Sequence, residues 1–282
     1  MKTSLPCLLL LALLSFAGCP ADLEVVPAYV LVEDFSLSTP GDGEPTTEIT
    51  EVWAFADEEF VGAFRLPARI PVARTGQTTL RFEAGVKQNG ILTTPEIYPF
   101  YTPVERVVDL APAQEVALGT LPIAYRPGTR FSVFEDFEPG SVRTFTDVIR
   151  GDTTLDATQE RVRSGEFSGK IFLSAAEPIL ELGSANTFVD VRNNGGFVWL
   201  EMDFLSDGRG QWGVSAPGTL GSQPIFDPGF NPRNEWTKIY FNLAPIINAL
   251  NTEPFQLNLL TVLPPDVEQG CVYVDNIKLI HF

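Results

Sequence analysis

Side chains able to do covalent or transition-metal chemistry are few in this sequence. It has one histidine, His281, and three cysteines, of which Cys271 lies in an apolar run near the C-terminal end. Hydroxyl–imidazole and thiol–imidazole nucleophiles need a histidine, and transition-metal sites draw mainly on histidine and cysteine. With so little of either, any catalysis would have to depend on carboxylates.

The carboxylate pair that stands out is Glu201 and Asp203, separated by one residue in an apolar run. Residues two apart on a strand point to the same face, so these acids would lie side by side. The two acids of a glycosidase must instead flank the scissile bond across a gap. We therefore predict that the protein is not an enzyme.

Three runs alternate apolar with polar or aromatic residues at a period of two: Val198–Phe204, Trp236–Leu243 and Phe255–Val262. This period predicts strands with an apolar face and an opposite face that mixes aromatics, amides, carboxylates and a lysine. Such a face suits sugars, because aromatic planes stack on C–H surfaces while amides and carboxylates pair with hydroxyls. The alternative is a solvated outer face with cross-strand pairs such as Glu201 with Lys238. The predicted ligand-binding residues are Trp199, Glu201, Asp203, Lys238, Tyr240, Asn242, Gln256 and Asn258, with Gln211 and Ser215 on the same polar side.

The first 18 residues have the three-part pattern of a secretory signal, with Lys2, an apolar run from Cys7 to Leu14, and small residues before Cys19. The apolar run is too short to span a bilayer. Phe16-Ala17-Gly18-Cys19 resembles the lipobox of bacterial lipoproteins, although its first position is usually aliphatic. The resemblance implies cleavage before Cys19 and lipidation of Cys19, and an ordinary secretory signal is the alternative.

The charge balance of the chain is strongly acidic. Its formal net charge is −17, and removal of residues 1–18 would take away Lys2 but none of the 36 Asp and Glu. An acidic surface repels nucleic acid and anionic lipid headgroups, so we expect neither as a partner.

The cysteines of the processed chain exclude an internal disulfide. Cys7 would be removed with the signal and Cys19 would be lipidated, so Cys271 would be the remaining free thiol. The fold must therefore be stabilised by hydrophobic cores.

The elements that must position these residues are predicted to be strands throughout. Short alternating runs are separated by turn signals, among them Asn89-Gly90, and helical periodicity is nearly absent. We predict an all-β protein with an anchor segment and linker over 19–47 that contains one short strand, followed by an immunoglobulin-like β-sandwich over 48–125. The cluster Tyr98–Tyr101 is interpreted as the cap of a core.

The remainder, about 131–282, carries four short motifs. They are Phe134–Gly140, Arg163–Ile171, Trp236–Leu243 and Val272–Leu279. Together they resemble the galactose-binding-like β-jelly-roll domains of many carbohydrate-binding modules. The resemblance implies a C-terminal β-jelly roll and non-catalytic glycan binding.

The same resemblance implies a structural calcium ion away from the sugar site. The matching acids are Glu138 and Asp275, with Asp136 as a less certain third ligand. Backbone carbonyls from the Arg163–Lys170 hairpin would have to complete the oxygen shell of such an ion. The alternative is that Asp275 pairs with a lysine or caps backbone N–H groups, and that Glu138 faces solvent.

These patterns predict a lipoprotein of the cell envelope, anchored to the bilayer through acylated Cys19, at the outer membrane or cell surface rather than the inner membrane. Its partner would be a glycan or another extracellular ligand. The alternative is a structural or accessory lipoprotein that contacts envelope proteins. In that case a flat apolar patch is expected around Tyr98–Tyr101 or Phe226–Phe230.

Overall fold

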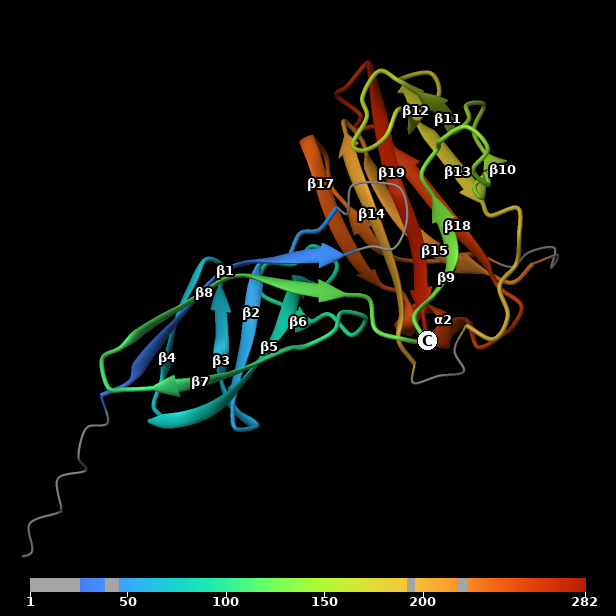
Figure 1. Cartoon of the computed structure of the whole chain (residues 1–282). Helices are drawn as coiled ribbons and strands as arrows, with labels where there is room; N and C mark the ends of the chain where they lie inside the picture. The colour runs from blue at the N-terminus through green and yellow to red at the C-terminus, as the bar shows by residue number, and fades with distance from the viewer. Residues whose placement is uncertain (1–25, 39–45, 192–195, 218–222) are drawn as a thin grey trace, which may run out of the picture.

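The computed structural model describes residues 26–38, 46–191, 196–217 and 223–282, so the predicted signal peptide and Cys19 lie outside the described residues. The described part is built of strands and one short helix, α2 (Ala244–Leu250), which confirms the predicted all-β class. The strands form two domains, β1 to β8 and β9 to β19, which pack against each other (Figure 1). Among the described helices none is long and apolar enough to cross a membrane.

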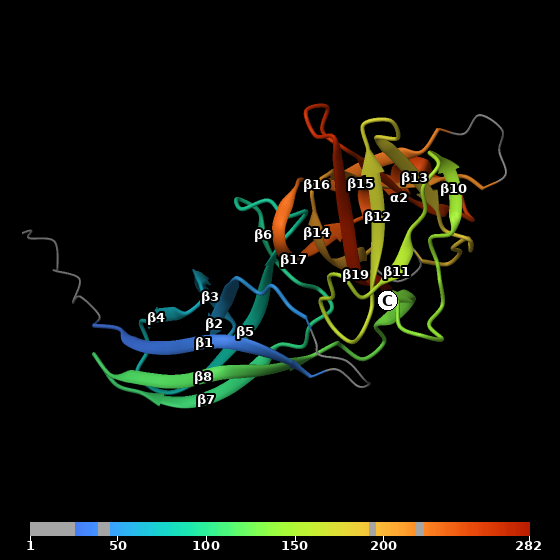
Figure 2. The ribbon, with the colours of Figure 1, turned by 90° about the horizontal axis from the view of Figure 1, so that it is seen from above.

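The first domain is a sandwich of two sheets. One sheet has the order β4-β1-β8, and the other has the order β3-β2-β5-β6, with β7 also paired to β5. Figure 2 shows β1 and β8 side by side along this domain, as their pairing requires. The strands are β1 (Ala28–Ser38), β2 (Glu51–Ala56), β3 (Glu59–Arg65), β4 (Ala68–Val72), β5 (Gly76–Lys87), β6 (Pro95–Ile97), β7 (Val104–Leu110) and β8 (Glu115–Ala124).

Strand β1 corrects the predicted start of this domain. The sequence pattern placed residues 19–47 in an anchor segment and linker with one short strand. The strand is present, but β1 pairs antiparallel with β4 and parallel with β8 and so belongs to the first domain. Its inward residues Ala28, Val30 and Val32 are buried in the core of the first domain. Parallel pairing with a strand far along the chain leaves no local signal, so the sequence could not reveal it.

The second domain is also a sandwich of two sheets. The orders are β11-β12-β19-β14-β17, with β9 on β19, and β10-β13-β18-β15-β16. The strands are β9 (Arg130–Glu135), β10 (Asp147–Arg150), β11 (Asp156–Thr158), β12 (Ser168–Ser174), β13 (Ile179–Gly183), β14 (Val198–Ser206), β15 (Arg209–Ser215), β16 (Ile225–Phe230), β17 (Arg233–Asn242), β18 (Gln256–Val262) and β19 (Gln269–His281).

The core of the second domain follows the predicted alternation. Val198, Leu200, Met202 and Phe204 of β14 all point into it, as do the apolar residues predicted for β17 and β18. The residues between them face outward from one sheet or the other. Burial of these aliphatic and aromatic side chains is the main force that holds the sandwich together, at roughly 1.5–3 kcal/mol for each large one.

The predicted Asn89-Gly90 turn is confirmed and joins the two domains. Both residues have positive φ, as a tight turn requires. The Asn89 N–H donates to the Tyr240 carbonyl at 2.8 Å, and the Asn242 N–H donates to the Asn89 side chain at 3.0 Å. A Cβ on Gly90 would lie 2.9 Å from Ile239, so glycine also permits this close approach.

Candidate functional site

The eight predicted ligand-binding residues are divided between two sheets. Trp199, Glu201, Asp203, Lys238, Tyr240 and Asn242 lie on β14 and β17, whereas Gln256 and Asn258 lie on β18 of the other sheet. Parity along each strand was predicted correctly, and all eight point away from the core of the second domain. The residues of β14 and β17 and those of β18 therefore face outward from opposite sides of the sandwich.

The outer face of β14 and β17 is covered by the first domain. Trp199, Tyr240 and Ile280 belong to the hydrophobic core of that domain, and the Tyr98 ring lies 5.3 Å from Trp199 and 5.0 Å from Tyr240. The expectation that this face is open to a ligand is therefore wrong. Tyr98–Tyr101 does cap a core as predicted, but the cap is shared with the second domain.

Glu201 is fully buried in this interface and is held by two tyrosines of the first domain. The Tyr98 hydroxyl donates to Oε1 at 2.6 Å, and the Tyr125 hydroxyl lies 3.0 Å from both carboxylate oxygens. Lys238 Nζ lies 3.4 Å from the same carboxylate, and Lys278 Nζ lies 3.8 Å from it. The predicted Glu201–Lys238 pair is thus present, but as a buried pair rather than a solvated one.

Asp203 forms the second half of this cluster. It accepts a hydrogen bond of 2.6 Å from the Thr46 hydroxyl and lies 3.4 Å from Lys238 Nζ and 3.4 Å from Arg163 Nε. Asn276 adds a fourth contact, an amide donor at 3.1 Å. Every oxygen of this buried carboxylate therefore has a partner, as burial of a charge requires.

Burial at the interface perturbs several ionisable groups. It raises the pKa of the Tyr98, Tyr101 and Tyr125 hydroxyls well above the usual range, and the Glu201 charge adds to this effect for Tyr98 and Tyr125. Burial acts to lower the pKa of Lys238, but Asp203 and Glu201 outweigh it and the net shift is upward. Burial, together with the Lys238 charge, lowers the pKa of Lys278 to about 8.

The interface cluster is defined here as Glu201, Asp203, Lys238, Lys278 and their first-domain partners. Its donors and acceptors come from both domains, and its charged side chains are almost completely buried. A polar cluster of this kind fixes one relative orientation, because any other leaves buried charges without partners. Its contacts join the two domains, and burial of its charged side chains closes this face to solvent.

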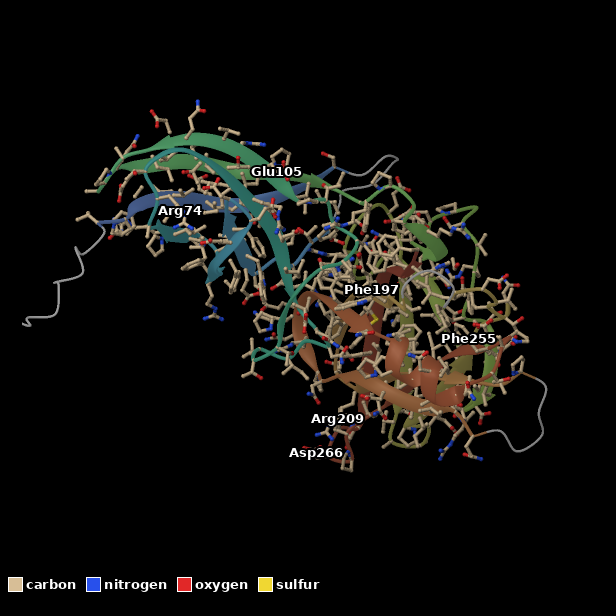
Figure 3. All side chains as sticks on the ribbon, turned by 90° about the horizontal axis from the view of Figure 1, so that it is seen from below. Arg74, Glu105, Phe197, Arg209, Phe255 and Asp266 are labelled. Carbon is tan, nitrogen blue, oxygen red and sulfur yellow. The ribbon has the colours of Figure 1, made fainter. Side chains whose placement is uncertain are left out.

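The outer face of the five-stranded sheet, β10-β13-β18-β15-β16, is the other outward surface of the second domain. Across it, Gln211 lies opposite Leu260, and Leu260 lies opposite Glu181. Gln211 and Arg209 are exposed, and Leu260 and Glu181 are partly exposed. Figure 3 shows Arg209 on the second domain, far from Arg74 and Glu105 of the first. We name this surface the open face.

Asn258 lies on the central strand of the open face, and its side chain is fully buried there. It is flanked by Gly183 and Gly213 on the neighbouring strands. Side chains lean over both glycines, since a Cβ on Gly213 would lie 2.5 Å from the Phe226 ring and one on Gly183 would lie 2.7 Å from the Gln256 amide. The glycines thus let Phe226 and Gln256 approach the sheet on either side of Asn258.

Two polar atoms of the open face are buried without a hydrogen-bond partner. Asn258 Oδ1 accepts from the Ser215 hydroxyl at 2.8 Å, but its Nδ2 has no partner, and neither does Glu181 Oε1. Reversing the amide would only transfer the deficit from one Asn258 atom to the other. Unpaired buried polar groups cost free energy, roughly 1–3 kcal/mol each, and such groups are uncommon unless a ligand or water completes them.

The acids predicted to bind calcium are engaged with backbone N–H groups. Asp275 accepts from Arg163, Ser164 and Asn276, and Glu138 Oε1 accepts from Glu166 at 2.7 Å and Phe167 at 3.0 Å. The donors of the 163–167 segment surround these oxygens with positive dipoles, which fits the alternative that Asp275 caps backbone N–H groups. Glu138 does the same instead of facing solvent. Among the described residues, no group of three or more acids, histidines or cysteines is arranged to hold a metal ion.

His281 contacts the hydroxyl of Ser132, and the sequence analysis did not predict this contact. Ser132 Oγ lies 2.7 Å from His281 Nε2, and the other ring nitrogen lies 3.0 Å from the Phe282 carbonyl oxygen. Ser132 sits at an irregularity in the pairing of β9 with β19, between the partners of Leu279 and Ile280. Within the described part of the chain no acidic side chain contacts this imidazole, so the carboxylate that orients the histidine of a catalytic triad is replaced by a carbonyl.

No protein family matches the sequence, and no curated protein matches it. Solved structures similar to the chain include variants of the carbohydrate-binding module CBM29-2. One covers 54% of this chain and 85% of its own length at 11% identity and a TM-score of 0.35. Another variant, complexed with cellulohexaose, matches 55% of this chain and 93% of the module's own length, at 14% identity and a TM-score of 0.34. The family 11 carbohydrate-binding module of the cellulase Lic26A-Cel5E of Clostridium thermocellum covers 55% and 95% at 11% identity and a TM-score of 0.36. At these values the matches do not assign the chain to a family.

Proposed function

We propose that the protein binds a glycan non-catalytically through the open face of its second domain. The observation that carries the proposal is the pair of buried polar atoms on this face without partners, Asn258 Nδ2 and Glu181 Oε1. A ligand rich in hydroxyls supplies both donors and acceptors at close spacing, so it can complete such groups where an apolar ligand cannot.

The surrounding side chains fit the same chemistry. Phe226 and Leu260 offer apolar surface for the C–H faces of a sugar ring, while Gln211 and Arg209 stand exposed beside them as hydrogen-bonding groups. Gln256 is already oriented by hydrogen bonds to the Ser184 carbonyl at 2.6 Å and to Asp147 at 3.2 Å. An amide held in this way loses little further freedom on binding.

The proposal places this binding at the cell envelope. The signal-like N-terminus would export the chain, and acylation of Cys19 would anchor it to a membrane through several chains, each buried CH₂ adding about 0.8 kcal/mol. The buried interface between the domains would then present the open face in a fixed orientation. The first domain would act as a stalk.

A structural or accessory role is the alternative, and one observation favours it. A cavity of about 480 Å³ is lined by Phe134, Val142, Phe188 and Val189 beside Ser132 of β9. Phe134, Val142 and Val189 are each about half or more exposed. An apolar surface of this kind on an edge strand suits contact with another protein.

The test is a glycan array with the full chain, followed by affinity measurement for the strongest glycan. Gln211→Ala and Phe226→Ala should each weaken binding, the second by roughly 1–3 kcal/mol because a stacking aromatic is lost. Arg69→Ala, at an exposed ion pair of the first domain, is the matched control and should bind as wild type. Absence of any glycan binding, or unchanged affinity in both open-face variants, would contradict the proposal.

A further inference from the structure

Three aromatic side chains gather on the outer face of the first-domain sheet that contains β3, β2 and β5. Trp53 and Phe55 alternate with the core residues of β2, and Phe60 lies opposite Phe55 on β3. The Trp53 and Phe60 ring centroids are 5.5 Å apart, and those of Phe55 and Phe60 are 5.4 Å apart. Phe60 is 56% exposed, so this cluster is a surface feature and not part of the core.

The tryptophan ring is held in place by a glycine. A Cβ on Gly85 would lie 3.0 Å from both Cδ1 and Nε1 of Trp53, so this edge of the indole rests against the backbone of β5. Trp53 and Phe60 are inclined by 33° to each other and form a shallow aromatic platform. A ring that is fixed before binding loses little conformational entropy when a ligand stacks on it.

The charges around the platform neutralise one another. Arg81 lies 3.9 Å above the Phe55 ring and pairs with Glu83, and Glu83 also lies 3.2 Å from Arg126. Glu58 pairs with Arg81 at 3.3 Å on the exposed side. Arg81, Arg126, Glu58 and Glu83 thus leave no unpaired charge among themselves. A further carboxylate beside Trp53 on this face of β2, Glu51, is buried and accepts a hydrogen bond from the Thr50 hydroxyl, so these described residues offer no free cation to an anionic ligand.

We propose that Trp53 and Phe60 form a second ligand site, on the first domain, for an uncharged glycan chain. The exposed Phe60 ring and the partly exposed Trp53 ring offer stacking to sugar C–H surfaces, and the neighbouring arginine and glutamate side chains offer hydrogen bonds to hydroxyls. The mutual pairing of the charges favours a neutral chain over an anionic one. This site is separate from the open face and does not depend on it.

The test is affinity electrophoresis of the full chain in native gels that contain one polysaccharide each. Galactomannan, xyloglucan and hydroxyethylcellulose are the uncharged probes, and polygalacturonate is the anionic one. We expect retardation by at least one uncharged polysaccharide and a loss of about tenfold or more in affinity with Trp53→Ala. Phe60→Ala, which leaves the core intact, should weaken binding in the same direction, and Gly85→Ala should do so by displacing the indole. Phe172→Ala removes a phenylalanine of similar exposure, 47%, from the second domain and should behave as wild type.

Open-face variants separate this inference from the proposed function. If Trp53→Ala and Phe60→Ala both match wild type while Gln211→Ala abolishes retardation, the second site is refuted and the open face is supported. If both platform variants lose affinity in a Gln211→Ala background, the second site stands alone. No retardation by any uncharged polysaccharide, or retardation by polygalacturonate alone, would overturn the inference.

Discussion

Replacement of Lys238 by methionine tests the interface cluster. The Lys238 side chain is fully buried, and its Nζ lies 3.4 Å from both the Glu201 and Asp203 carboxylates. The variant keeps the length of the side chain but leaves two buried acids without their shared cation. Removing one partner of a buried ion pair costs roughly 3–5 kcal/mol.

Two nearby cations place the expected loss at the low end of that range. Lys278 lies 3.8 Å from Glu201, and Arg163 lies 3.4 Å from Asp203, so each acid keeps one positive neighbour. We therefore expect a loss of about 3 kcal/mol, which lowers the melting temperature by roughly 6–12 °C for a chain of this size.

Calorimetry and urea unfolding of the full chain measure this effect. Arg69→Ala is the control, because the Arg69–Glu115 pair is half exposed and such pairs contribute about 0–1 kcal/mol. Because the cluster joins the domains, Lys238→Met should also separate their unfolding into two transitions. A variant as stable as the control, with a single transition, would refute the role given to this cluster.

The remaining predictions concern other parts of the chain. Burial raises the pKa of Asp275 to about 7, so between about pH 4 and pH 7 the folded state holds a proton that the unfolded state has lost, and stability falls as the pH rises through this range. Asp275→Asn should therefore lose less stability than wild type between about pH 4 and pH 7, and equal losses would count against this. Added calcium and then chelator should leave the melting temperature unchanged, because backbone donors already engage Glu138 and Asp275; a rise with calcium would restore the predicted ion. Cys19→Ala should move from the membrane to the soluble fraction, and a variant that still fractionates with membranes would exclude the acyl anchor. Leu257→Ala, at a fully buried position, should cost about 2–5 kcal/mol, and a loss below about 1 kcal/mol would contradict the assigned core.

Local alternation predicted much of this fold. It identified the inward faces of β14, β17 and β18 and the hairpin of β2 and β3. It could not tell that β14 and β18 belong to different sheets, because a period of two gives the face of each strand and not its neighbours. Six predicted residues were therefore assigned to one open surface together with Gln256 and Asn258, although the two groups lie on opposite sides of the sandwich.

One signal for the covered face was present in the sequence. Trp199 and Tyr240 are large aromatics on the polar side of strands whose other side is apolar apart from Thr237. Two such residues together indicate burial on both faces, and here the first domain supplies the second covering layer. Thr46 and Tyr98, which complete the cluster, come from loops far away in the chain and had no local pattern to reveal them.

Hydrogen–deuterium exchange with and without the strongest glycan from the array tests the central claim most directly. Ligand on the open face should slow exchange in β15 (Arg209–Ser215) and β18 (Gln256–Val262), while β14 (Val198–Ser206) beneath the first domain should be unchanged. Unchanged exchange in β15 and β18 at a saturating concentration of a glycan that binds would contradict the account, as would slowing confined to β14 and β17.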